Sequence, residues 1–193
     1  MAAPTNSARL LEGAIRYALG SLTCVTPGAL SRPTPCAAWD LATLLQHVND
    51  SLAALHEGIA TGYVGLGPAA KTAADPAGGL LATFRDRAGR LLTASAAAGD
   101  HDRAVAVADR RLAGGVVAAV GAVEIAVHGW DIAEACGCHR PIPPALARGI
   151  LEIAPLVVTD AARDVHFTAP VTVSPLASPS DRLVALLGRN PRA

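Results

Sequence analysis

The longest apolar stretch of this 193-residue chain runs from Ala113 to Ala135 and is hydrophobic on every helical face. A helix that is apolar all round is typical of the buried centre of a protein. Up to Ala133 only three ionisable side chains interrupt it, Glu124, His128 and Asp131. At 100° per residue these three fall within an arc of roughly 60°. The pattern therefore predicts a buried central helix with one narrow polar arc.

Three earlier segments have apolar residues at helical spacing and predict amphipathic helices. The first begins at Ser7, a residue type that often caps helices, and ends near Val25. The second follows Asp40, a favourable N-cap, and covers Leu41 to about Ile59. The third begins at Asp75-Pro76, a typical N-cap and first-turn pair, and stops near Gly99.

The rest of the chain is less regular. Residues 104–108 alternate and predict a short strand fragment in a polar linker. After several prolines, residues 145–161 predict another helix, 165–173 are extended, and Ser180 or Asp181 caps a final short helix. We therefore expect a mainly all-α four-helix bundle with a short helical and extended C-terminal segment. Residues 1–138 form the bundle and residues 139–193 pack on it, in one domain overall.

Composition narrows the function classes. The formal net charge is zero and no run of Lys or Arg occurs, which argues against a nucleic-acid partner. The N-terminus lacks the basic start and apolar core of a signal peptide. The central apolar stretch carries the polar arc, so we read it as protein core and not as a membrane span. We expect a cytoplasmic protein, and so apolar a bundle can form a homodimer through one face.

The four cysteines are too sparse and irregular for a disulfide framework. Cys136 and Cys138 precede His139, but their spacing differs from the two-residue spacing of structural zinc sites, and no second pair completes them. We expect reduced cysteines that mainly pack.

Carboxylate and imidazole groups are costly to bury unless they are paired, hydrogen-bonded or bound to metal. The polar arc is therefore either a metal centre or a Glu124–His128 pair within the helix. His47, on the second helix, lies roughly 110° from the centre of the apolar stripe. Its neighbours on the helix surface are small, which suits a side chain that points into a cavity, although an ordinary, partly exposed histidine has the same pattern.

Two motifs together resemble a known family. PTPCAAWDLATLLQHV (33–48) and VEIAVHGWDIAEACG (123–137) are similar to the paired signatures of the DinB/YfiT-like metal-binding superfamily. More closely, they resemble the metal-binding domain of mycothiol-dependent maleylpyruvate isomerases and their short actinobacterial relatives. The end of the chain also matches those relatives, so the resemblance spans nearly the whole sequence.

The resemblance implies a four-helix bundle with the metal ligands His47, Glu124 and His128. Two imidazoles and one carboxylate leave coordination positions open, as in catalytic zinc sites. Zinc is the first expectation, and nickel or iron are alternatives. Asp131 either orients an imidazole or forms a salt bridge or a hydrogen bond to the PTPC loop. Trp39 and Trp130 are expected to be packing anchors.

The function that the resemblance implies is metal-dependent chemistry of a low-molecular-weight thiol, such as mycothiol, with a small electrophilic substrate. The full-length isomerases carry a sizeable C-terminal domain that is missing from this sequence. We therefore expect a thiol S-transferase or a related isomerase-like enzyme.

Two alternatives stay open. One is a noncatalytic metal-binding or ligand-binding bundle, in which Cys36 or Asp131 closes the metal site as a fourth ligand. The other is a buried His–Glu pair without metal.

Overall fold

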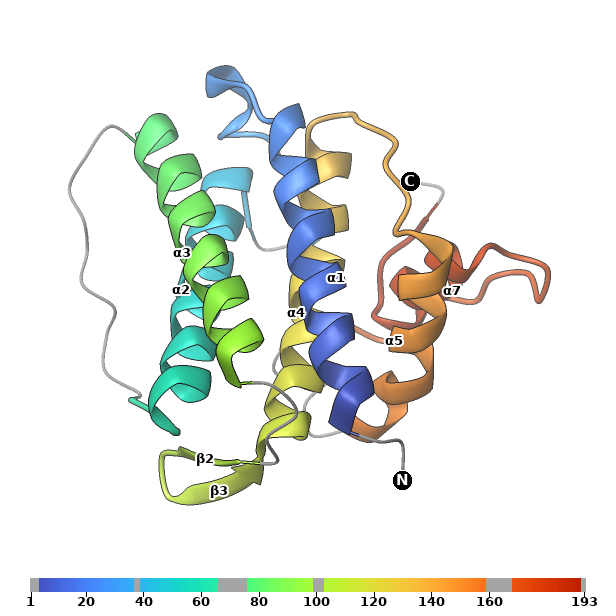
Figure 1. The fold of residues 1–193 in the computed structure, drawn as a ribbon. Helices are drawn as coiled ribbons and strands as arrows, with labels where there is room; N and C mark the ends of the chain where they lie inside the picture. The colour runs from blue at the N-terminus through green and yellow to red at the C-terminus, as the bar shows by residue number, and fades with distance from the viewer. Residues whose placement is uncertain (1–3, 37–38, 66–75, 99–102, 159–167, 192–193) are drawn as a thin grey trace.

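The computed structural model describes residues 4–36, 39–65, 76–98, 103–158 and 168–191. Within them the chain is mainly helical, which confirms the predicted fold class (Figure 1). Two short 3-10 helices, η1 (Leu22–Cys24) and η2 (Pro27–Ala29), follow the first α-helix. The described α-helices are α1 (Pro4–Ser21), α2 (Leu41–Thr61), α3 (Pro76–Ala98), α4 (Gly114–Ala135), α5 (Pro144–Val157) and α7 (Pro179–Leu186).

Helices α1 to α4 form the bundle. Helix α1 packs along α4, α2 packs along α3, and contacts between α2 and α4 join the two pairs (Figure 1). Helix α5 lies against α4 and α1, and α7 packs against α5. One hydrophobic core runs through all of them and includes Leu45, Ile125, Ile150 and Leu183.

Helix α4 is the buried centre that its apolar pattern predicts. Its residues from Val117 to Ala133 are buried, except for Val120 and Glu124. It is the one described helix that is long and apolar enough to cross a membrane, but 83% of its 18-residue apolar window is buried inside the protein. At Gly129 a Cβ atom would lie 3.0 Å from the Cα atom of Ala18, so glycine allows α1 to pack closely here.

Two predicted helix caps are wrong. Helix α1 already includes Pro4, whose fixed φ suits a first turn, so Ser7 lies inside the helix. Helix α7 is capped by Ser178, whose hydroxyl accepts a hydrogen bond from the Asp181 amide. Ser180 does not cap the helix, because its buried hydroxyl accepts the Ile142 amide instead.

The other predicted helix boundaries lie closer to those that the structure shows. Asp40 caps α2 as predicted, since its carboxylate accepts the Thr43 amide at 2.8 Å. Asp75, the expected cap of α3, lies outside the described residues. The predicted 145–161 helix is observed as α5, which ends at Val157, and residues 159–161 are not described. Of the extended segment, residues 168–173 form neither helix nor strand.

A small sheet covers one end of the bundle. Strand β2 (Ala104–Val107) pairs in parallel with β1 (Tyr63–Val64) and antiparallel with β3 (Arg110–Ala113). The sequence predicts the middle strand alone and wrongly assigns the start of β3 to a linker, because such short strands carry little periodicity. The sheet packs on the end of α2 at Gly58, where a Cβ atom would meet Val64 and Val105.

Candidate metal centre

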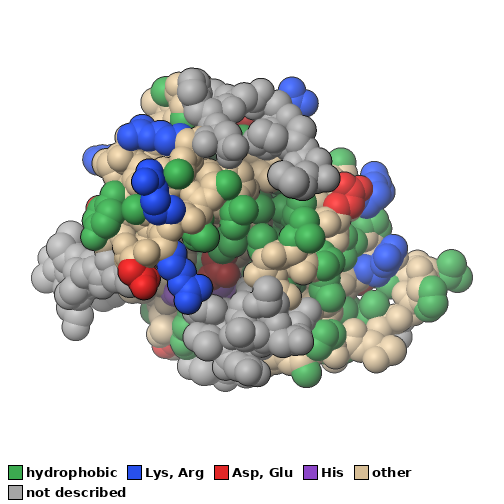
Figure 2. Space-filling view, turned by 90° about the horizontal axis from the view of Figure 1, so that it is seen from below, with side chains coloured by type: hydrophobic (Ala, Val, Ile, Leu, Met, Phe, Trp, Pro, Cys, Tyr) green, Lys and Arg blue, Asp and Glu red, His purple; other side chains and the backbone are tan. Residues whose placement is uncertain are grey.

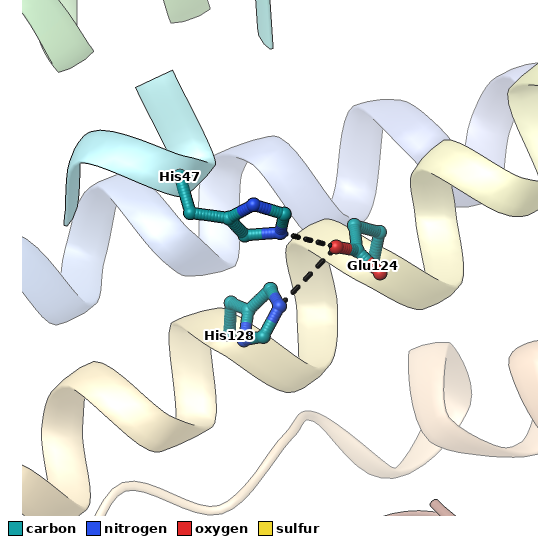
Figure 3. Close-up of side chains that lie close together, drawn as sticks. All are labelled: His47, Glu124 and His128. Carbon is teal, nitrogen blue, oxygen red and sulfur yellow. Dashed lines mark hydrogen bonds and ion pairs between the residues drawn. The ribbon is translucent and has the colours of Figure 1, made fainter. Parts of the chain in front are cut away.

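Three side chains expected to act together meet between α2 and α4. Glu124 and His128 are one turn apart on α4, and His47 reaches the same point from α2, 77 positions from Glu124 (Figure 3). One ligand atom from each side chain, a ring nitrogen or a carboxylate oxygen, lies within 4.8 Å of the other two. Helix geometry fixes the α4 pair, and the packing of α2 on α4 adds the third residue.

Both imidazoles converge on one carboxylate oxygen. His47 Nε2 lies 2.7 Å from Glu124 Oε1, and His128 Nε2 lies 3.2 Å from the same atom. Burial alone would raise the pKa of Glu124, but the hydrogen bonds from His128 and His47 outweigh burial and hold it well below its usual range. The carboxylate is therefore ionised at neutral pH and ready to accept a cation.

His128 is held on both sides. Its Nδ1 donates to Asp131 Oδ2 at 2.9 Å, while its Nε2 faces Glu124. Burial lowers its pKa, but the hydrogen bonds to Asp131 and Glu124 dominate and raise the pKa to about 9. The Asp131 contact keeps a proton on Nδ1, as is usual for metal-ligating histidines, so a metal would bind at Nε2 and displace the second proton that the ring carries at neutral pH.

Asp131 has a second partner that the sequence did not reveal. Arg189, which follows α7, donates from Nη2 to Asp131 Oδ2 at 2.9 Å and from Nε to Oδ1 at 3.3 Å. Both side chains are buried, the aspartate completely. Asp131 therefore both orients an imidazole and forms a salt bridge, but with the C-terminal segment and not with the PTPC loop. A carboxylate on the buried helix needs a hydrogen-bond donor, which the sequence does indicate. No sequence pattern identifies that donor as an arginine 58 residues away.

Trp39 completes one wall of the site. Its ring centroid lies 4.6 Å from that of His47 and 6.2 Å from that of His128. Trp39 thus packs on both imidazoles, and Trp130 lies buried in the core. The ring contacts of Trp39 and the burial of Trp130 agree with the packing role expected for these residues.

The donor set fits a divalent ion. Two nitrogens and one carboxylate oxygen are typical zinc ligands, and two ligands of one tetrahedral zinc lie about 3.3 Å apart. The 3.2 Å separation of His128 and Glu124 matches that value, and the shorter His47 contact is a direct hydrogen bond. Among the described residues no further His, Cys, Asp or Glu joins this cluster. The three ligand atoms thus leave coordination positions open.

The two residues considered as a fourth ligand are placed differently. Asp131 is engaged by His128 and Arg189, so it is not available to a metal. Cys36 is a half-buried free thiol, and burial is the main cause that raises its pKa. Cys136 and Cys138 are also free thiols, and in the described part of the chain they belong to no metal-ligating cluster.

The site opens into a cavity of about 330 Å³, and His47 and Glu124 belong to its lining. His47 and Glu124 keep 31% and 19% of their side chains exposed, whereas His128 keeps 4%. Figure 2 shows the hollow, with acidic and histidine side chains deep inside and hydrophobic side chains around them. A small molecule can therefore reach the first two side chains.

The fold and the site together define a class: a helical bundle whose central helix and a neighbour present two histidines and a glutamate to a cavity. Within that class the family is clear. The sequence profile of the mycothiol maleylpyruvate isomerase N-terminal domain matches residues 11–133, and the chain belongs to this family. Comparison with curated proteins gives no match, and comparison with solved structures gives none.

Proposed function

We propose that this protein is a metal-dependent enzyme in which a low-molecular-weight thiol of the mycothiol type reacts with a small electrophile. His47, Glu124 and His128 hold a divalent ion, zinc in the first instance. The observation that carries the proposal is the convergence of three ligand atoms at the end of a cavity large enough for a ligand. The family supports the choice of thiol.

A divalent ion at this site would lower the pKa of a thiol and make thiolate available at neutral pH. Asp131 and Arg189 hold the His128 ring so that Nε2 faces the Glu124 carboxylate. Trp39 packs on the two imidazoles and limits their rotation.

The chemistry that follows is addition of a thiolate to an activated carbon–carbon double bond. A carbon–sulfur bond forms, and the electron pair of the double bond moves onto the electron-withdrawing group. Rotation and loss of the same thiolate give an isomer. If a proton from solvent is taken up at carbon instead, the thiol stays attached and the reaction is an S-transfer. The second outcome is the one we propose.

The first test is metal content of protein purified without a histidine tag. Wild type is compared with His47→Ala, Glu124→Ala and, as a matched control, His56→Ala on the same helix. About one divalent ion per chain in wild type and in the control, lost in the two site variants, supports the proposal. Turnover is then measured with mycothiol and activated alkenes.

A second candidate is supported by a specific observation. In the triad of His47, Glu124 and His128, the Glu124 carboxylate already has a hydrogen bond from His47 and an ion pair with His128, so this partly buried polar cluster is satisfied without an ion. A wild-type protein that takes up neither zinc nor nickel would favour that candidate. Metal uptake without turnover would favour a noncatalytic metal-binding bundle.

A further inference from the structure

The cavity next to the triad differs sharply from the triad in polarity. Besides His47 and Glu124, the described residues of its lining include one polar side chain, Ser51 of α2. The other lining residues are Val, Leu, Ala and Gly from α2, α4, β1 and the end of α5. The lining thus has one strongly polar end and otherwise apolar walls.

The charges around the cavity matter for what can enter it. No Lys or Arg belongs to its described lining, and the charged carboxylate in that lining is Glu124. Figure 2 shows Lys and Arg side chains on this face outside that lining, some of them beside the hollow. With one end of a ligand at the proposed metal site, a carboxylate farther along the ligand would have no Lys or Arg as a partner on these walls. Burial of such an unpaired charge is costly.

An uncharged apolar group is favoured by the same walls. The volume of about 330 Å³ lies at the lower end of the range for small-molecule pockets, which is about 300–1,000 Å³. The Ser51 hydroxyl can take one neutral polar group.

We propose, resting on the proposed function, that the electrophilic substrate carries an uncharged alkyl or aryl body that fills this cavity, with its reactive end at the triad. The substrate is thus an apolar monofunctional electrophile and not a small dicarboxylate. Valines from α4 and the end of α5, Val117, Val120 and Val157, form much of the surface against which the body packs.

The test is a ligand series on zinc-loaded protein, measured by calorimetry. The probes are n-alkanethiols from two to eight carbons, beside ω-mercaptocarboxylates of the same lengths. The thiol anchors each probe at the zinc, and its chain stands in for the body of the electrophile in the cavity. Each methylene buried in the cavity tightens alkanethiol binding about fourfold until the cavity is full. The carboxylates bind at least about tenfold more weakly at equal length, because their charge is left unpaired.

Two exposed valines on α4 provide a matched pair of variants. Val120 lines the cavity and Val116 does not, and their side chains are similarly exposed, at 46% and 42%. Val120→Lys should flatten the dependence on alkyl length and bring the carboxylates level with the alkanethiols. Val116→Lys should change neither series.

Alkanethiol affinity that does not depend on chain length, or carboxylates that bind as tightly, overturns the substrate class while the metal proposal stands. If the protein binds no zinc, the proposed function fails, and the alkanethiol series is measured on the metal-free chain. If affinity rises with chain length on the metal-free protein and this rise disappears in Val120→Lys, the cavity is still assigned to an apolar ligand. A flat series there overturns the assignment.

Discussion

The salt bridge between Arg189 and Asp131 gives the sharpest prediction. It links the C-terminal segment to Asp131, which in turn contacts the proposed metal ligand His128. The guanidinium makes two contacts with the carboxylate, which itself accepts from His128. Arg189→Met removes the charge and keeps much of the aliphatic volume. Asp131 is then left completely buried with His128 as its remaining charged partner.

The magnitude follows from that burial. Removal of one partner from a buried ion pair costs about 3–5 kcal/mol, because the other charge is left without compensation. We expect Arg189→Met to lower the free energy of unfolding by about 3 kcal/mol, the lower end of that range, because His128 still compensates part of the Asp131 charge. We also expect zinc affinity to fall by roughly 10–100-fold, as is usual when the partner of a ligating histidine is disturbed.

Urea unfolding and zinc titration on the same samples measure both effects. Arg182→Met on α7 is the control, since Arg182 is exposed and should stay within about 0.5 kcal/mol of wild type. The double variant Arg189→Met with Asp131→Asn should be more stable than Arg189→Met alone, because no lone buried carboxylate remains.

Two results would refute this reasoning. If Arg189→Met unfolds within about 1 kcal/mol of wild type, the pair does not hold the C-terminal segment to the bundle. If its stability falls while zinc affinity is unchanged, Asp131 does not position His128 through this contact.

Three further predictions concern other parts of the molecule. In metal-free protein the pKa of His128 is raised from 6.5 to about 9. The protonated ring therefore stabilises the fold by up to about 3 kcal/mol. This stabilisation is complete below pH 6.5 and is lost as the pH rises through 9. Urea unfolding at pH 6.5 and 9.5 checks this, and His128→Gln should reduce the difference, leaving the smaller part that comes from buried thiols such as Cys36. Gly129→Ala should lower the free energy of unfolding by about 1–3 kcal/mol, because the new Cβ meets the backbone of Ala18. Gly89→Ala should raise it by about 0.5–1 kcal/mol, because nothing lies within 4 Å of a Cβ there. Equal thermal shifts in the two variants would contradict the close approach of α1 and α4. Ala108→Gly should stabilise the protein by about 1 kcal/mol, since Ala108 has a φ of 51° in the β2–β3 turn, and an unchanged melting temperature would refute the strain.

The sequence by itself determined the features that depend on neighbours along one helix. The apolar pattern of 113–135 placed a buried helix, and the fixed rotation per residue put Glu124, His128 and Asp131 on one face of it. Asp40 as the cap of α2 was determined in the same local way. The two motifs then pointed to His47 through the family, which the sequence profile supports.

Only the tertiary structure decided which residues distant in the chain complete the site. The packing of α2 on α4 sets how close His47 comes to the Glu124 carboxylate, and this depends on the shapes of whole helix faces. Arg189 reaches Asp131 because the C-terminal segment folds back over the bundle. Ser180 does not cap α7, because its hydroxyl accepts a hydrogen bond from the Ile142 amide. Local periodicity carries no information on such contacts, because they depend on how separate elements pack against one another.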